Sequence, residues 1–150
     1  MEYIAIGAAP GIAICLFIFY KDIYNREPKF NLILSFILGC LAIFPAIWFE
    51  TFFGATNDGT VMGTAIYTYA VVAFSEEFSK FLGLRLYSYS RPSFDDPFDG
   101  IVYGVMVSMG FATLENVLYV LKYAQLGQGW QIGIQRMFLS VPAHATFGII

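Results

Sequence analysis

The acidic side chains best suited to chemistry in this chain lie inside apolar runs. Glu76 and Glu77 are adjacent in AVVAFSEEFSKFLGL, residues 70–84, and Lys80 follows at helical spacing. Charged side chains are rare in such runs, usually face the interior of a helix bundle, and commonly serve function. Two adjacent glutamates with one lysine leave a surplus acid, which a purely structural ion pair does not need. We therefore interpret Glu76 and Glu77 as a functional pair.

A third carboxylate ends another apolar run. Glu115 and Asn116 close GFATLEN, and no cation follows Glu115 before Lys122. The absence of a nearby counter-charge again favours a functional role for Glu115, with Asn116 beside it.

The single histidine, His144, lies in the stretch SVPAHATFG. Residues four apart share a helix face, so His144 lies on one row with Arg136. Pro142 removes the helical hydrogen bond to the carbonyl of Phe138 and predicts an opened helix beside His144. An opened helix next to a titratable residue is typical of a water-accessible site.

Carboxylates, an imidazole and an amide in a partly dry cavity are suited to hydrolysis. A glutamate can take a proton from water as it attacks a peptide carbonyl. Asn116 and His144 can donate hydrogen bonds to the oxyanion that forms. Glutamate and histidine are also zinc ligands, so a metal that activates water is the alternative. We favour a site that requires no cofactor, and the ligands of the zinc alternative are Glu76, Glu77, Glu115 and His144.

These residues require helices to position them in a membrane. The chain is 58% hydrophobic and 13% charged, whereas a soluble domain is about 45–50% apolar and about 25% charged. The sequence has no basic face of the kind that would indicate a nucleic-acid partner. Apolar runs long enough to cross a bilayer as helices cover residues 3–20, 30–53, 61–84, 98–121 and 132–150. We predict one all-α polytopic transmembrane domain over residues 1–150, with the third helix continuing through LRLYSYS.

The loops predict an orientation and leave room for more chain. Lys21, Arg26 and Lys29 lie in the first loop and Arg85 and Arg91 in the third, while GATNDGT carries no Lys or Arg. The positive-inside rule then puts the N-terminus outside a cell membrane. The last apolar run ends at HATFGII without a flanking charge, which leaves room for segments after residue 150.

The fourth apolar run carries a row of small residues, which lets membrane helices approach closely. The row consists of Gly100, Gly104, Ser108 and Ala112. We expect it to pack against the third segment. At the start of the run, Asp96 before Pro97 predicts a helix cap. Asp99 in the first turn suits the helix dipole, and we also keep it as a supporting residue of the site.

Three motifs around these residues resemble those of PrsW-type intramembrane proteases. EEFSK at 76–80 resembles the family's EExxK motif, and FDGIVYGVMVSMGFATLEN at 98–116 resembles the second motif. HATFG at 144–148, with Arg136 upstream, resembles the third. The motifs follow the family's order over about half of the chain, and HExxH, GxSxG, GxGD and Walker motifs are absent.

The resemblance implies a membrane protease that makes the first cut in a membrane-bound anti-sigma factor. It also implies distant kinship with CAAX-processing proteases, which use glutamate and histidine on water. Family members have been described as glutamic proteases and as metalloproteases, and they usually continue with further helices. The family's functional positions correspond here to Glu76, Glu77, Glu115 and His144, with Lys80 and Asn116 in support.

We therefore expect an intramembrane endopeptidase whose partners are the bilayer and a single-pass membrane protein. Glu76 or Glu77 is the expected general base, and the other is a charge partner held by Lys80. The expected supporting residues are Lys80, Asn116, Asp99 and Arg136. Two alternatives are a catalytically silent scaffold that binds membrane helices through the Gly104 row and a proton-coupled transporter.

Overall fold

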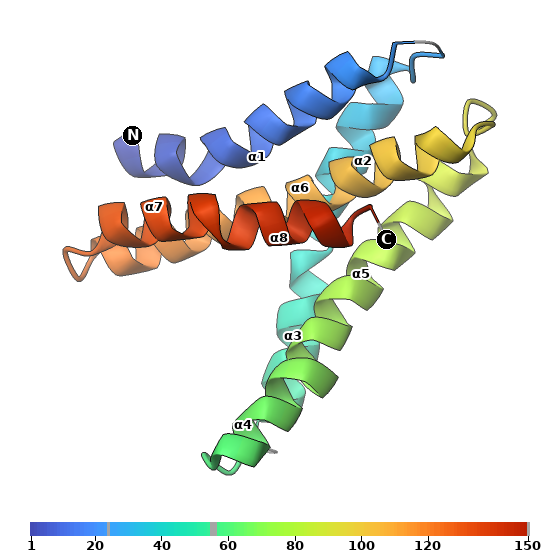
Figure 1. Ribbon diagram of the computed structural model, residues 1–150. Coiled ribbons are helices and arrows are strands. Elements are labelled where there is room, and N and C mark those ends of the chain that lie inside the picture. The colour runs from blue at the N-terminus through green and yellow to red at the C-terminus, as the bar shows by residue number, and fades with distance from the viewer. Residues whose placement is uncertain (24, 55–56, 150) are drawn as a thin grey trace.

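The computed structural model describes residues 1–23, 25–54 and 57–149, and within them the regular structure is entirely helical (Figure 1). The predicted all-α class is confirmed. In chain order the elements are α1 (Glu2–Lys21), α2 (Lys29–Leu41), α3 (Ile43–Phe53), α4 (Val61–Ile66), the π-helix η2 (Tyr67–Ala73), α5 (Phe74–Leu86), the 3₁₀ turn η3 (Ser88–Ser90), α6 (Pro97–Ala124), α7 (Gly129–Phe138) and α8 (Ser140–Phe147).

All five predicted segments are helical, but they differ in regularity. Among the described residues, three helical stretches are long and apolar enough to cross a membrane: Glu2–Lys21, Lys29–Phe53 and Pro97–Ala124. The third predicted segment changes to the π-helix η2 without a break in the helix, and the fifth is broken at Leu139. The expected continuation through LRLYSYS is wrong, because α5 ends at Leu86 and a 3₁₀ turn follows.

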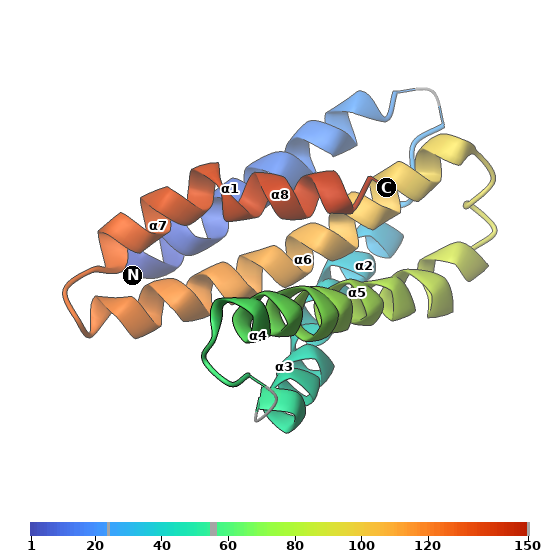
Figure 2. The same cartoon turned by 60° about the horizontal axis from the view of Figure 1, so that its bottom comes forward.

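Helix α6 forms the centre of the molecule. It packs against α1, α2, α7, α8 and α5 (Figure 2), and most of its residues between Val102 and Asn116 are buried. Its start is fixed as predicted: Asp96 and Asp99 form a capping box, and Pro97 occupies the first turn. Because the other helices pack around α6, its packing surfaces determine where their polar side chains lie.

The small residues of α6 contact α8, not the third segment as expected. A Cβ at Gly104 would lie 2.2 Å from the carbonyl oxygen of Gly148, and a Cβ at Gly148 would lie 2.8 Å from Ser108 Oγ. Ala112 packs with Val141 of α8. Gly100 lies outside this contact, since only Phe94 approaches it. A row of small residues predicts a close neighbour but carries no information about which helix that is.

Two prolines coincide with helix breaks. The α2–α3 break falls at Ala42, three residues before Pro45, and the α7–α8 break at Leu139 falls three residues before Pro142. Each proline therefore lies in the first turn of a new helix, where its missing N–H costs least. The predicted opening beside His144 is confirmed.

A buried polar network joins the first loop to the start of α6. Tyr103 Oη donates to the carboxylate of Glu27 and lies 3.2 Å from Ser93 Oγ, which accepts from Asn31 at 3.3 Å. Glu27 is only 3% exposed. Burial raises the pKa of the Glu27 carboxyl, and the nearby carboxylates of Asp99 and Asp22 raise it further.

Candidate active site

Lys80 lies at the centre of a polar cluster between α5 and α8. Its buried ammonium is 2.5 Å from Glu77 Oε1 and 3.2 Å from His144 Nδ1. An ammonium only donates hydrogen bonds, so Nδ1 of His144 accepts from it. The proton of the neutral ring is then on Nε2. The predicted pairing of one glutamate with Lys80 is made by Glu77.

Nε2 of His144 faces the third carboxylate, on α6. It lies 3.3 Å from Glu115 Oε2, the same oxygen that Arg136 Nη2 of α7 contacts. The guanidinium of Arg136 also lies 4.2 Å from the ring centroid of Tyr119. Glu115 therefore has a cation partner from a distant part of the chain, and α6, α7 and α8 meet at this carboxylate.

Asn116 fixes Arg136 rather than facing the cavity. Its Oδ1 accepts from Arg136 Nε at 2.7 Å and its Nδ2 donates to the carbonyl oxygen of Gly7 at 2.9 Å. The residue is 0% exposed. Both ends of the amide are bonded inside the protein, which favours a positioning role over the oxyanion donation that we expected.

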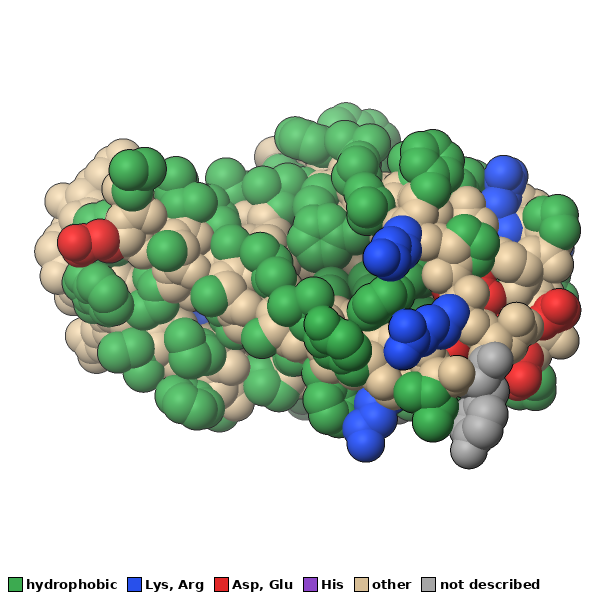
Figure 3. Space-filling model, turned by 90° about the horizontal axis from the view of Figure 1, so that it is seen from above, with side chains coloured by type: hydrophobic (Ala, Val, Ile, Leu, Met, Phe, Trp, Pro, Cys, Tyr) green, Lys and Arg blue, Asp and Glu red, His purple; other side chains and the backbone are tan. Residues whose placement is uncertain are grey.

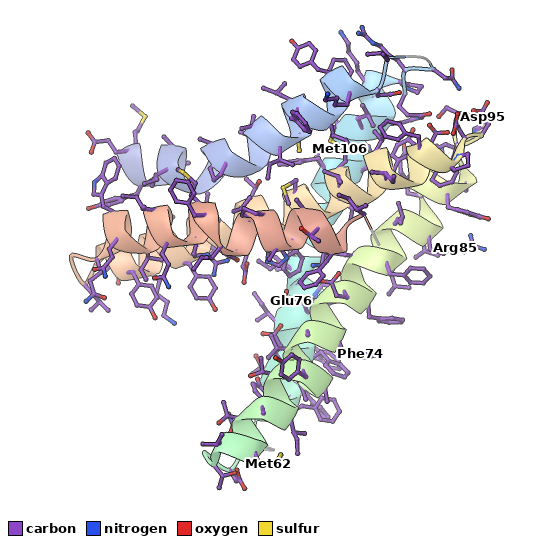
Figure 4. All side chains as sticks on the ribbon, in the orientation of Figure 1. Met62, Phe74, Glu76, Arg85, Asp95 and Met106 are labelled. Atoms are coloured by element: carbon purple, nitrogen blue, oxygen red, sulfur yellow. The ribbon has the colours of Figure 1, made fainter. Side chains whose placement is uncertain are left out.

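Glu76 faces a cavity of about 240 Å³ between α3, η2, α5 and α6. In Figure 4 it lies midway along the continuous α4–η2–α5 helix, near the crossing with α3. Within the described chain, Glu76 makes no ion pair, whereas Glu77 is held by Lys80. Glu115 lines the same cavity. The two adjacent glutamates thus have different surroundings, one facing the cavity and one paired.

Sequence reasoning missed a further acid in this cavity, Glu50 of α3. Ser75 Oγ donates to Glu50 Oε1 at 3.2 Å, and Tyr67 Oη donates to the Glu50 carbonyl oxygen at 3.0 Å. The signal was available, because Glu50 is a lone carboxylate within the second apolar run. The contacts come from η2 and α5, and π-helical turns occur frequently at functional sites.

The donor set fits a divalent metal in its chemistry. Glu76, Glu77 and His144 each offer one ligand atom, and these atoms lie within 4.8 Å of one another. Three protein ligands of these types are typical of catalytic zinc. However, Lys80 is within 3.2 Å of two of them, so an ion would have to displace or repel this ammonium. Glu115, also expected as a ligand, is outside the group.

Asp99 lies away from the cluster. Its Oδ2 accepts from the backbone N–H groups of Asp95 and Asp96 at 2.9 Å and 2.7 Å, and Asp99 is only 1% exposed. Along α6 it is about 24 Å from Glu115, at 1.5 Å per residue. The structure therefore gives Asp99 the capping position that the sequence predicted, and it does not bring Asp99 to Glu76 or His144.

Comparison with known proteins agrees with the motifs. The family model described as "PrsW family intramembrane metalloprotease" matches residues 27–150. Protease PrsW of Geobacillus kaustophilus is 37% identical over 147 residues, which cover 98% of this chain and 62% of that protein. The Bacillus subtilis protein is also 37% identical, covering 98% of this chain and 64% of the relative.

Protease PrsW of Oceanobacillus iheyensis is 31% identical over 150 residues, covering 100% of this chain and 66% of the relative. The chain therefore spans less than two thirds of the length of these relatives. No solved structure matches it. With a family model that covers most of its length, and with the family's motif residues gathered around Lys80, the chain belongs to the PrsW family.

Proposed function

We propose that this chain carries the catalytic centre of an intramembrane endopeptidase, which hydrolyses a peptide bond in a membrane-anchored protein such as an anti-sigma factor. The observation that carries the proposal is the convergence of Glu76, Glu77 and His144, from two separate helices, around one buried ammonium beside a cavity. Membership of the PrsW family and relatives named Protease PrsW support it.

Glu76 is the general base in this proposal. It faces the cavity without an ion-pair partner in the described structure, so its carboxylate is available to water, whereas Glu77 neutralises Lys80. The oxygen of the bound water attacks the carbonyl carbon as Glu76 takes one of its protons. The C–N bond then breaks, and this proton goes to the leaving amine.

The remaining residues oppose charge and hold the site together. The buried ammonium of Lys80 faces the negative charge that develops on the substrate carbonyl oxygen, in surroundings that screen it weakly. His144 connects Lys80 to Glu115 through its two ring nitrogens and can pass a proton between these two side chains. Arg136 binds the Glu115 carboxylate, and Asn116 holds Arg136 in place.

A metal-dependent version would use part of the same cluster. Glu76, Glu77 and His144 would hold the ion. When bound, zinc would polarise the carbonyl and lower the pKa of the attacking water. Because Lys80 already supplies positive charge to Glu77 and His144, we propose that cleavage requires no metal.

The protein acts within a cell membrane, with its N-terminus outside and its first and third loops in the cytoplasm. The distribution of Lys and Arg over the loops supports this orientation. The scaffold alternative loses its main support, because the Gly104 row that would bind partner helices is covered by α8.

Cleavage of a single-pass membrane substrate by the full-length protein in nanodiscs tests the proposal. The wild type is compared, with and without a strong chelator, with Glu76→Gln/Glu77→Gln, and the exposed Glu2→Gln is the control. We expect cleavage that survives chelation, is lost in the double variant and is retained by Glu2→Gln. Loss on chelation and recovery with zinc would establish the metal mechanism instead. Substrate capture without any cleavage would favour the scaffold, and substrate-independent proton flux the transporter.

A further inference from the structure

A second, separate groove runs along the face of the molecule formed by α1 and α2. Its volume is about 410 Å³, and no residue that lines it also lines the cavity at Glu76. Its walls are apolar side chains such as Leu16, Phe19 and Ile33, and Met106 of α6, labelled in Figure 4, contributes to its lining. Among the described residues that line it, the charged one is Lys29, at the first turn of α2.

Cations gather where this groove meets the first loop. The Arg26 guanidinium and the Lys29 ammonium each lie 5.8 Å from the ring centroid of Phe19, which lines the groove. In the described ranges neither of these two cations forms an ion pair. Figure 3 shows Lys and Arg side chains toward one end of a largely apolar face, with Asp and Glu side chains also visible at that end.

The two acids of the same loop are buried and bonded within the protein. Asp22 is 4% exposed and accepts from the backbone N–H of Glu27 at 2.9 Å. Glu27 is 3% exposed and accepts from Tyr103 of α6. The loop therefore presents its positive charges outward while its two carboxylates are used inside. In the part of the chain that the structure describes, Arg26 and Lys29 are therefore not paired with the carboxylates of their own loop.

We propose that this groove binds an anionic phospholipid. One acyl chain lies between α1 and α2, and the phosphate contacts Arg26 and Lys29. Basic pockets between membrane helices recognise anionic head groups. The charge pattern selects against a zwitterionic lipid, because Asp22 and Glu27, the two described carboxylates of the loop, are buried and do not face a choline or ethanolamine group. If the first loop is cytoplasmic, the lipid belongs to the cytoplasmic leaflet, where anionic lipids attract basic segments.

Native mass spectrometry of the full-length protein tests the site with phosphatidylglycerol and phosphatidylcholine of identical acyl chains. We expect phosphatidylglycerol to bind more tightly. Arg26→Gln/Lys29→Gln should weaken its binding about 25-fold, since each cation contributes about a factor of five, and should weaken phosphatidylcholine binding much less, so that the preference is lost. The matched control Arg85→Gln/Arg91→Gln removes the same charge from side chains that stack on Tyr89 and Tyr87. We expect this control to bind phosphatidylglycerol like the wild type.

A second variant tests the acyl chain. Leu16→Trp fills the groove wall and should weaken both lipids equally. Three results would overturn the proposal. They are a preference for phosphatidylglycerol that survives Arg26→Gln/Lys29→Gln, an equal loss in the control pair, and a Leu16→Trp protein that binds both lipids normally but cleaves its substrate more slowly. The last result would assign the groove to a substrate helix.

Discussion

At the scale of single residues, Asn116 separates a positioning role from a catalytic one. Its amide joins Gly7 of α1 to Arg136 of α7. Asn116→Ala should lower the free energy of unfolding by about 1–3 kcal/mol, because it leaves buried polar groups without partners. Thermal unfolding in detergent measures this, with the exposed Asn25→Ala as control. An oxyanion donor would instead lower the cleavage rate of Asn116→Ala and leave its melting temperature unchanged.

Glu27 gives the fold a predictable dependence on pH. Burial raises its folded-state pKa above the usual 4.5. The folded state therefore holds this proton more tightly than the unfolded state. The resulting stability is fully present below about pH 4.5 and is lost as the pH rises through the raised pKa. Melting temperatures over this range should decline more for the wild type than for Glu27→Gln. Parallel curves for the two proteins would contradict the assignment, and Glu2→Gln is the control.

Much of the site could be predicted at this scale because charged groups in apolar runs are costly. Glu76, Glu77, Glu115 and His144 were identified in this way, and the structure brings the first two and His144 together near Lys80, with Glu115 joined to them through His144. The partners were harder to predict, because they depend on contacts between distant helices. Arg136 reaches Glu115 from 21 residues away.

At the scale of helices, the contact between α6 and α8 determines where His144 lies. A Cβ at Gly104 would collide with the backbone of Gly148, whereas Gly100 has room for one. Gly104→Ala should therefore cost about 1–3 kcal/mol of stability through overpacking and reduce cleavage by shifting α8. Gly100→Ala should be neutral or stabilising, because alanine favours helix over glycine by about 1 kcal/mol. Melting temperatures and cleavage rates of both variants check this, and equal effects would contradict the role of the α6–α8 contact.

Helix boundaries could be predicted from the sequence where a specific residue sets them. Pro142 predicted the opening before His144, and Asp96 with Pro97 predicted the start of α6. The π-helix η2 was not predicted, because nothing in YTYAVVA separates it from an ordinary apolar helix. The partner of the Gly104 row was predicted wrongly for a related reason, since small residues fit several neighbours equally well.

At the scale of the whole molecule, the arrangement of loops predicts which side of the membrane each faces. Single cysteines at positions 25 and 58, in a background with Cys15→Ala and Cys40→Ala, report this with a membrane-impermeant maleimide on intact cells. Asp58→Cys should be labelled from outside and Asn25→Cys only after lysis, because the first loop carries the Lys and Arg residues. The reverse pattern would invert the orientation and move the proposed lipid site to the outer leaflet.

The number of helical segments was predictable because apolar length is a property of the sequence alone. Their packing was not, since it depends on which helix is surrounded. Helix α6 carries the family's second motif and is also the most buried of the three candidate spans, at 72% of its apolar window. Helix α6 therefore borders both the α1–α2 groove and the cluster around Lys80.

The central claim is that Glu76 is the general base and Glu77 the partner of Lys80. Turnover of a single-pass substrate by the full-length Glu76→Gln and Glu77→Gln proteins, measured with their melting temperatures, tests it most directly. We predict that Glu76→Gln lowers the turnover rate by about 10²–10⁴-fold without lowering the melting temperature. Glu77→Gln should lower the melting temperature, because it leaves Lys80 without its carboxylate. A Glu76→Gln protein that turns over at the wild-type rate, beside an inactive but fully stable Glu77→Gln protein, would contradict the claim.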